Sequence, residues 1–176
     1  AFVWSFVKRH LQKYLIALLL QSVAMILKLT HNCMEPTRLE KIINSIFEVL
    51  NDDIANYRNS PDDWKISEGN VAICMITEDG RIYGKLYGND KLRQRKFFRV
   101  AWLKASQVWI TGHKTGEYEK IVFGGNMNPE DSPIELPDLI GWVGGQPIQL
   151  DSATRIAVGF SGFRGFNDID IVQKAV

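Results

Sequence analysis

Basic and aromatic side chains gather in one stretch of the sequence, LRQRKFFRVAWLKASQVW, which covers residues 92–109. Lys96 or Arg99 can hold a carboxylate through charge-assisted hydrogen bonds, and Trp102 can supply an apolar wall beside it. Nucleic acids are bound by the same residue types. The aromatic side chains, however, fall largely on the side predicted to face the core, and the formal net charge of the chain is only +1. We therefore expect a small ligand with an acidic group, and no nucleic acid.

One histidine, His113 in ITGHKTGEY, stands in a polar segment directly after this stretch. Its imidazole could be an axial ligand of haem iron, a general base, or a solvated side chain. The carboxylate of Asp168, near the start of the last predicted helix, is a second candidate acid–base group. Neither residue has an orienting partner in a recognisable motif, and the three histidines have no zinc-site spacing. Catalysis is the weaker interpretation, and no metal site is predicted.

Two adjacent glycines, Gly144 and Gly145 in LIGWVGGQPIQL, have the look of a phosphate-binding loop. Such a loop needs a helix N-terminus after it, so that backbone N–H groups and the helix dipole meet the anion. Here Pro147 and a β-prone run follow, and the Lys-Ser/Thr pair of a P-loop is absent. The two glycines therefore predict a tight turn into a strand.

The chain has 176 residues, of which 45% are hydrophobic and 23% are charged, as in one ordinary globular domain. Its two cysteines, Cys33 and Cys74, fit neither a metal-ligand spacing nor a disulfide framework. Reduced thiols predict a cytoplasmic protein.

An apolar segment near the N-terminus, YLIALLLQSVAMIL, leaves export or membrane association as alternatives to that location. The segment covers 14 residues, fewer than the roughly 20 that a membrane span needs. We therefore favour a helical extension over residues 1–36, with a domain over residues 37–176, and do not favour membrane association through residues 1–33.

Local patterns in residues 37–176 predict the order helix, hairpin, helix, loop, hairpin, helix. Apolar residues at steps of three and four predict a first helix over residues 37–57, and Asp79-Gly80 between β-prone runs predicts a hairpin. Residues 92–109 form a second amphipathic helix, with Phe98, Ala101, Trp102, Ala105 and Trp109 on its apolar side and the basic residues, Lys104 included, mostly elsewhere.

Later segments follow the same logic. A short helix is expected over 117–123, an irregular loop over 126–137, strands over 146–150 and 155–160, and a final helix that Asn167 or Asp168 caps. These elements predict an α+β domain in which helices cover a small antiparallel sheet.

The run LPDLIGWVGGQPIQL, followed by RIAVGFSGFRGFNDIDIVQKAV, resembles the C-terminal signature of the GlcG/HbpS-like family, also named the haem-degrading domain family. The elements that carry the resemblance are a Gly-Gly-x-Pro-Ile-like turn, a strand ending in a Val-Ser-Gly-like element, and an acidic residue at the last helix: Gly144, Gly145, Pro147 and Ile148, then 158–162, then Asn167 and Asp168. The hairpin turn Thr77 to Gly80, and Lys96 with Ala101 and Ala105, occupy further corresponding places. The resemblance covers roughly residues 37–176, with residues 58–69 as an insertion.

This resemblance implies a compact α/β domain with a central antiparallel sheet of about five strands, and assembly into homo-oligomers. Some members of the family bind haem, so haem is the candidate cofactor. We predict a binding pocket near the second helix and the glycine turn, lined by Lys96, Arg99, Trp102, His113, Gly144 and Gly145.

Three functional hypotheses follow from these residues. The first is a homo-oligomeric domain that binds a small ligand, with haem as the candidate. The second is an enzyme acting on a small organic acid or carbonyl substrate, with His113 or Asp168 as acid–base group. The third is a structural or adaptor module whose N-terminal helix docks a partner.

Overall fold

The computed structural model describes residues 37–176, so the predicted extension over residues 1–36 lies outside the described part of the chain. Residues 40–176 form one compact unit. Its first helix, α2 (Arg38–Asn56), has the predicted bounds within a residue. Ile43, Ile46, Leu50 and Ile54 are its buried residues, as the spacing of apolar residues predicted.

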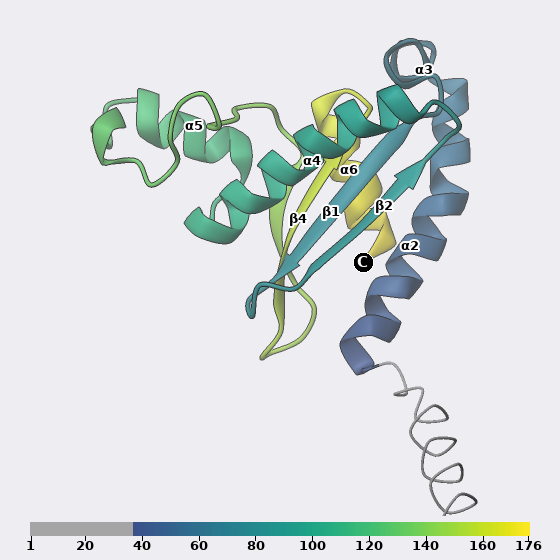
Figure 1. The fold of residues 1–176 in the computed structure, drawn as a ribbon, viewed down its shortest axis with the longest axis horizontal. Helices are drawn as coiled ribbons and strands as arrows, with labels where there is room; N and C mark the ends of the chain where they lie inside the picture. The colour runs from purple at the N-terminus through teal and green to yellow at the C-terminus, as the bar shows by residue number, and fades with distance from the viewer. Residues whose placement is uncertain (1–36) are drawn as a thin grey trace, which may run out of the picture. The chain divides into compact units, whose positions relative to one another are not determined.

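A four-stranded antiparallel sheet forms the centre of the domain (Figure 1). Its strands are β1 (Val71–Thr77), β2 (Ile82–Tyr87), β3 (Gly145–Gln149) and β4 (Arg155–Ser161), in the order β2-β1-β4-β3. Both predicted hairpins are confirmed, whereas the described residues form four strands instead of about five. The buried central strand, β1, pairs with β2 on one side and with β4 on the other.

Helices cover both faces of this sheet, and β2 shows which helix lies on which face (Figure 1). On one face the ring of Phe98, from α4 (Lys91–Thr111), lies over Gly84. On the other face the Tyr87 hydroxyl donates a hydrogen bond to the carbonyl oxygen of Phe47 in α2 at 3.1 Å. Side chains alternate along a strand, so α4 and α2 pack on opposite faces.

The buried face of α4 differs from the one that its apolar pattern predicted. Ala101 and Ala105 are buried as expected, but Lys104 is buried as well, while Trp102 and Trp109 are 37% and 41% exposed. A Cβ atom on Gly159 of β4 would collide with the carbonyl oxygen of Ala101, so helix and strand backbones are in close approach. Only small or extended side chains fit between them, and the bulky tryptophans lie at the flanks of the contact.

Residues 58–69, expected to be an insertion with turn formers, fold into two short helices, η1 (Tyr57–Asn59) and α3 (Pro61–Ser67). Pro61 begins α3, where its missing N–H costs no hydrogen bond. After α4 the chain forms α5 (Thr115–Phe123), confirming the third predicted helix, and then a loop that contains η2 (Pro129–Asp131) and a cis Leu136–Pro137 bond.

The last helix, α6 (Gly165–Ala175), begins earlier than predicted, and its N-cap residue is Arg164 in place of Asn167 or Asp168. The Asp168 carboxylate instead accepts a hydrogen bond from the backbone N–H of Phe163, outside the helix. Across residues 37–176, the helices are all too short or too polar to span a membrane.

Candidate functional site

A groove of about 500 Å³ lies between α4, α5 and the segment 137–142. Helix α4 contributes two cations, Lys96 and Arg99, and α5 contributes the carboxylate Glu119. The remaining lining is mostly apolar: Val100, Leu103, Pro137, Leu139, Ile140, Gly141 and Trp142. The groove therefore combines cationic side chains with an apolar wall from a distant part of the sequence, the kind of surface that suits an amphipathic ligand.

Two buried polar side chains hold the segment that forms this wall. The Gln107 amide donates to the carbonyl oxygen of Ile140 at 3.0 Å and accepts from its N–H at 2.8 Å, so it pairs with the backbone as a neighbouring strand would. The Thr115 hydroxyl donates to the carbonyl oxygen of Trp142 at 2.8 Å and accepts from the N–H of Gly145. These bonds satisfy buried backbone groups and fix the wall relative to α4 and α5.

Gly144 and Gly145 follow this wall in the sequence and are buried, and neither lines the groove. Gly144 has φ +126°, and a Cβ atom there would lie 2.5 Å from the Lys104 ammonium nitrogen. A Cβ atom on Gly145 would lie 2.5 Å from a methyl carbon of Thr115. The turn into β3 needs two glycines because it passes directly over these side chains.

Trp102 lies beside the main groove and lines two adjacent hollows. One, of about 410 Å³, shares Lys96 and Arg99 with the main groove and adds Leu92, Arg95 and Phe98. The other, of about 340 Å³, lies between the C-terminal half of α4 and residues 133–138. The structure thus brings together three of the six predicted binding residues, Lys96, Arg99 and Trp102, on one side of α4.

His113 stands apart from these three residues. It is exposed at the turn after α4, where its ring stacks on that of Tyr118 with centroids 6.2 Å apart, and it lines none of the three hollows.

A buried ion pair in the core is a contact that the sequence pattern missed. The ammonium of Lys104 lies 2.8 Å from a carboxylate oxygen of Asp168 and donates to the carbonyl oxygen of Phe160 at 2.9 Å. Burial raises the pKa of the Asp168 carboxyl to about 7, although the Lys104 ammonium and the N–H of Phe163 lower it. Both side chains are enclosed, so the pair joins α4 to the start of α6 and does not face a ligand.

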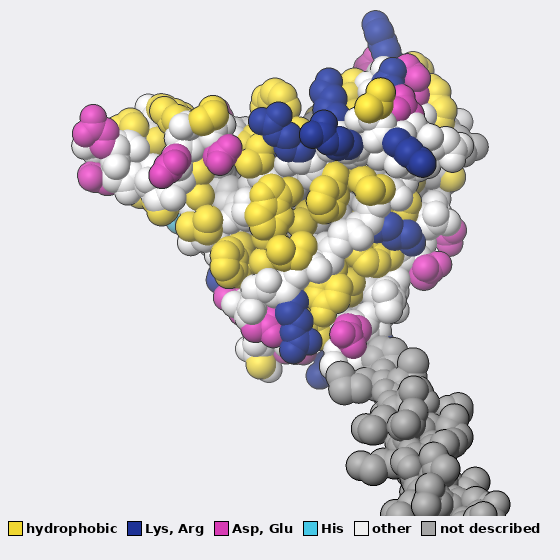
Figure 2. Space-filling view, viewed as in Figure 1, with side chains coloured by type: hydrophobic (Ala, Val, Ile, Leu, Met, Phe, Trp, Pro, Cys, Tyr) yellow, Lys and Arg dark blue, Asp and Glu magenta, His cyan; other side chains and the backbone are white. Residues whose placement is uncertain are grey.

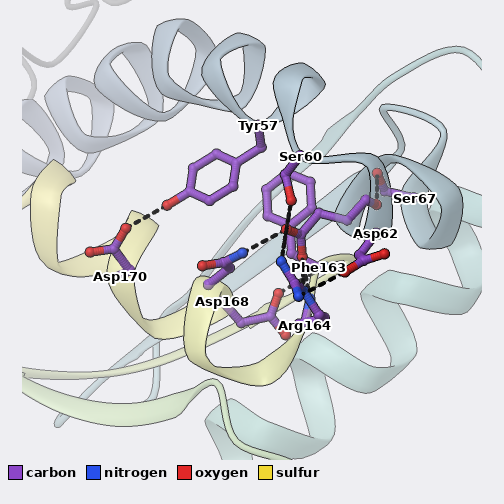
Figure 3. A network of polar contacts seen from close by, with 10 residues as sticks. Tyr57, Ser60, Asp62, Ser67, Phe163, Arg164, Asp168 and Asp170 are labelled. Atoms are coloured by element: carbon purple, nitrogen blue, oxygen red, sulfur yellow. Dashed lines mark hydrogen bonds and ion pairs between the residues drawn. The ribbon is translucent and has the colours of Figure 1, made fainter.

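A second polar network holds α3 against the start of α6 (Figure 3). The buried Asp63 accepts hydrogen bonds from the backbone and side chain of Arg164, from Asn167 at 2.6 Å, and from Ser60. Burial alone would raise the pKa of Asp63, but these donors outweigh it and lower the pKa to about 2. The segment taken for an insertion thereby positions the turn that carries Asp168.

Comparison with known proteins gives structural matches only. No family model matches the chain, and neither does any curated protein. An HbpS double mutant from Streptomyces reticuli is 13% identical, with a TM-score of 0.52 over 75% of this chain and 82% of that one.

Two further solved structures agree with the first. The Klebsiella pneumoniae protein ORFY is 15% identical, with a TM-score of 0.53 over 77% of this chain and 85% of its own. PduOC, in a complex with haem, is 15% identical, with a TM-score of 0.52 over 77% of this chain and 89% of its own.

The chain has the HbpS-like fold. The resemblance in its C-terminal sequence is thereby confirmed at the level of the fold. The HbpS-like domain keeps the glycine turn where the motif placed it. Lys96 is exposed, and Lys104, which the helical pattern assigned to the polar side of α4, is buried. The position of Lys104 between Ala101 and Ala105, both small, is the sequence signal that could have identified it.

Proposed function

We propose that the HbpS-like domain binds a small amphipathic ligand with acidic groups in the groove between α4, α5 and residues 137–142, and that it forms homo-oligomers. The observation that carries the proposal is the placement of Lys96 and Arg99 beside the apolar wall at Leu139 and Trp142. Cations on one side can bind carboxylates, while the wall buries an apolar ring.

Haem is the candidate ligand, because it has acidic groups and an apolar ring and because PduOC, which has the same fold, was crystallised with haem. Lys96 and Arg99 would hold its propionates, and Val100, Leu103 and Leu139 would contact the ring. The residues that line the groove include no histidine, cysteine or methionine. Binding would therefore depend on the ring and its acidic groups more than on an axial ligand from this surface.

The enzyme hypothesis loses one of its two candidate groups. Asp168 is 2% exposed and paired with Lys104, so a substrate cannot reach it without opening the core. His113 is exposed, but its ring neighbour is the aromatic ring of Tyr118, which does not orient an imidazole as a carboxylate does. Binding is thus better supported than acid–base catalysis.

Hemin titration followed by absorbance tests the proposal. The wild type should shift the Soret band at micromolar hemin, and Lys96→Ala with Arg99→Ala should weaken binding by about tenfold or more, since each lost charge-assisted hydrogen bond costs about 1.5–3 kcal/mol. Lys65→Ala with Lys120→Ala is the matched control, because both lysines are exposed and lie outside the groove. A hemin affinity that the groove variant leaves unchanged would reject this site.

Two additional arms separate the ring from the iron. Protoporphyrin IX, which lacks iron, should bind with an affinity close to that of hemin if the ring and propionates dominate. His113→Ala should leave hemin affinity unchanged for the same reason. A large loss in either arm would show that iron ligation, and not the groove, carries the binding.

A further inference from the structure

The free edge of β2 carries an apolar surface that no described part of the chain covers. Ile82 and Leu86 are 53% and 48% exposed on the face of the sheet that α4 occupies. Phe98 lies over Gly84 between them, and the Trp109 ring lies near Gly80 at the hairpin turn. Figure 2 shows hydrophobic side chains gathered over β2 and α4, below a row of basic side chains. Contiguous exposed apolar surface of this kind marks an interaction site.

The backbone of β2 is also free to pair along this edge. The backbone N–H of Thr77 donates to the carbonyl oxygen of Arg81, so these two residues form a hydrogen-bonded pair of the β1–β2 ladder. Along β2, every second residue from Arg81 then bonds to β1, and the residues between them do not. The N–H and C=O groups of Ile82, Gly84 and Leu86 therefore point away from β1. In the described sheet β2 is an end strand, so these three residues face no other strand.

The opposite edge of the sheet is protected, which makes the contrast informative. In β3 the same alternation turns Gly145, Pro147 and Gln149 outward. Pro147 has no N–H, and the N–H of Gly145 already donates to Thr115. Edge strands of natural proteins are commonly blocked in this way, and β2, which contains no proline, is not.

We propose that a second copy of this chain pairs with β2 along this edge, antiparallel and centred on Gly84. In that register Gly84 lies opposite Gly84 of the second copy, and Ile82 lies opposite Leu86 of the second copy. All three residues with outward backbone groups therefore have a partner on the other strand. A shift that places Lys85 opposite Lys85 loses one of these pairs and opposes like charges. The surface is thus complementary to itself, as a two-fold interface requires.

The exposed apolar side chains favour the same occupant. In the chosen register Ile82 of one copy lies beside Leu86 of the second copy at two symmetric positions, so both exposed side chains become covered. The hairpin turn adds no unpaired charge to the ends of the strands, because Asp79 is paired with Arg81 and Glu78 with Arg155 in the same chain.

Molar mass in solution, measured by light scattering on the full chain, tests the interface. The wild type should show at least twice the 20.0 kDa of one chain, and Ile82→Lys with Leu86→Lys should halve the mass. Ile82→Lys with Leu86→Glu should restore the wild-type mass, because each lysine then faces a glutamate of the second copy. Ile66→Lys with Phe166→Lys, two positions on other elements that are 42% and 61% exposed, is the control and should leave the mass unchanged.

A wild-type monomer, a double-lysine variant at the wild-type mass, or a Lys/Glu variant no heavier than the double-lysine variant would each overturn the proposal. Amide hydrogen exchange of the unmodified protein gives a test that needs no variant. The N–H groups of Ile82, Gly84 and Leu86 should exchange more slowly as protein concentration rises, and concentration-independent fast exchange would also overturn it.

The interface rests on the homo-oligomer proposed above and not on the ligand. Because β2 contributes nothing to the lining of the main groove, the double-lysine variant should titrate with hemin as the wild type does. Loss of the dimer with hemin binding retained, or the reverse, therefore tells the two proposals apart.

Discussion

Replacing Lys104 with methionine should cost little stability at pH 5 and about 3 kcal/mol at pH 9. Methionine keeps the length of the side chain but removes the ammonium, so Asp168 loses its buried cation and keeps only the N–H of Phe163. The side chains of the pair are 2% and 3% exposed, so water does not screen the lost interaction. Such a loss is a large fraction of the 5–15 kcal/mol that typically holds a domain folded.

The pH dependence follows from the proton on Asp168. Burial raises the pKa of this carboxyl to about 7 even with Lys104 in place, and removal of the ammonium takes away its main opposing influence. A carboxyl whose pKa is raised on folding contributes stability that is full below the unfolded pKa, near 4, and is lost as pH rises through the folded pKa. In the wild type this loss ends near pH 7, whereas in the variant it continues above pH 7 at about 1.4 kcal/mol per pH unit.

Urea unfolding at pH 5, 7 and 9, followed by circular dichroism, measures the effect. Lys96→Met, an exposed lysine on the same helix, should show no pH-dependent difference from the wild type. Adding Asp168→Asn to Lys104→Met should abolish the extra loss above pH 7. If Lys104→Met differs from the wild type by the same amount at pH 5 and pH 9, the account of a buried, ionised pair is refuted.

Three further outcomes follow from the packing. Gly144→Ala should lower the free energy of unfolding by about 2–5 kcal/mol in thermal or urea unfolding, because its φ is strained and the new Cβ atom collides with its neighbours. Gly125→Ala, with φ +82° and open space around it, should lose only about 1–2 kcal/mol. Equal losses in the two variants would contradict the close approach at Gly144. Gln107→Leu should leave both backbone groups of Ile140 unpaired, lower the free energy of unfolding by about 2–4 kcal/mol and weaken hemin binding; unaltered binding would show that the wall is held by other contacts. The pKa of Asp63 is lowered to about 2, so its contribution of about 1–2 kcal/mol to the free energy of unfolding is present above pH 4 and lost as pH falls towards 2. Asp63→Asn should therefore be less stable than the wild type at pH 7 and approach it at pH 2. A stability difference that stays constant through an acid titration would disprove the assignment.

The sequence by itself determined the elements whose signals are local. The three- and four-residue spacing from Ile43 to Ile54 is a property of one helix, and Asp79-Gly80 specifies a hairpin without help from distant residues. The glycine turn was also readable, because Pro147 and a β-prone run follow it directly. Two of the predicted cations, Lys96 and Arg99, reach the groove because they lie on the exposed side of an amphipathic helix.

Only the tertiary structure decided which charges are buried and what stands opposite them. A helical pattern assigns a lysine to water, but Lys104 is buried because its partner Asp168 lies 64 residues later and because α4 packs closely on Gly159. The groove wall likewise depends on Gln107, which binds Ile140 across 33 residues. Periodicity reports how one segment meets its surroundings, whereas the cost of burying a charge or a backbone group is set by partners that only the folded chain brings together.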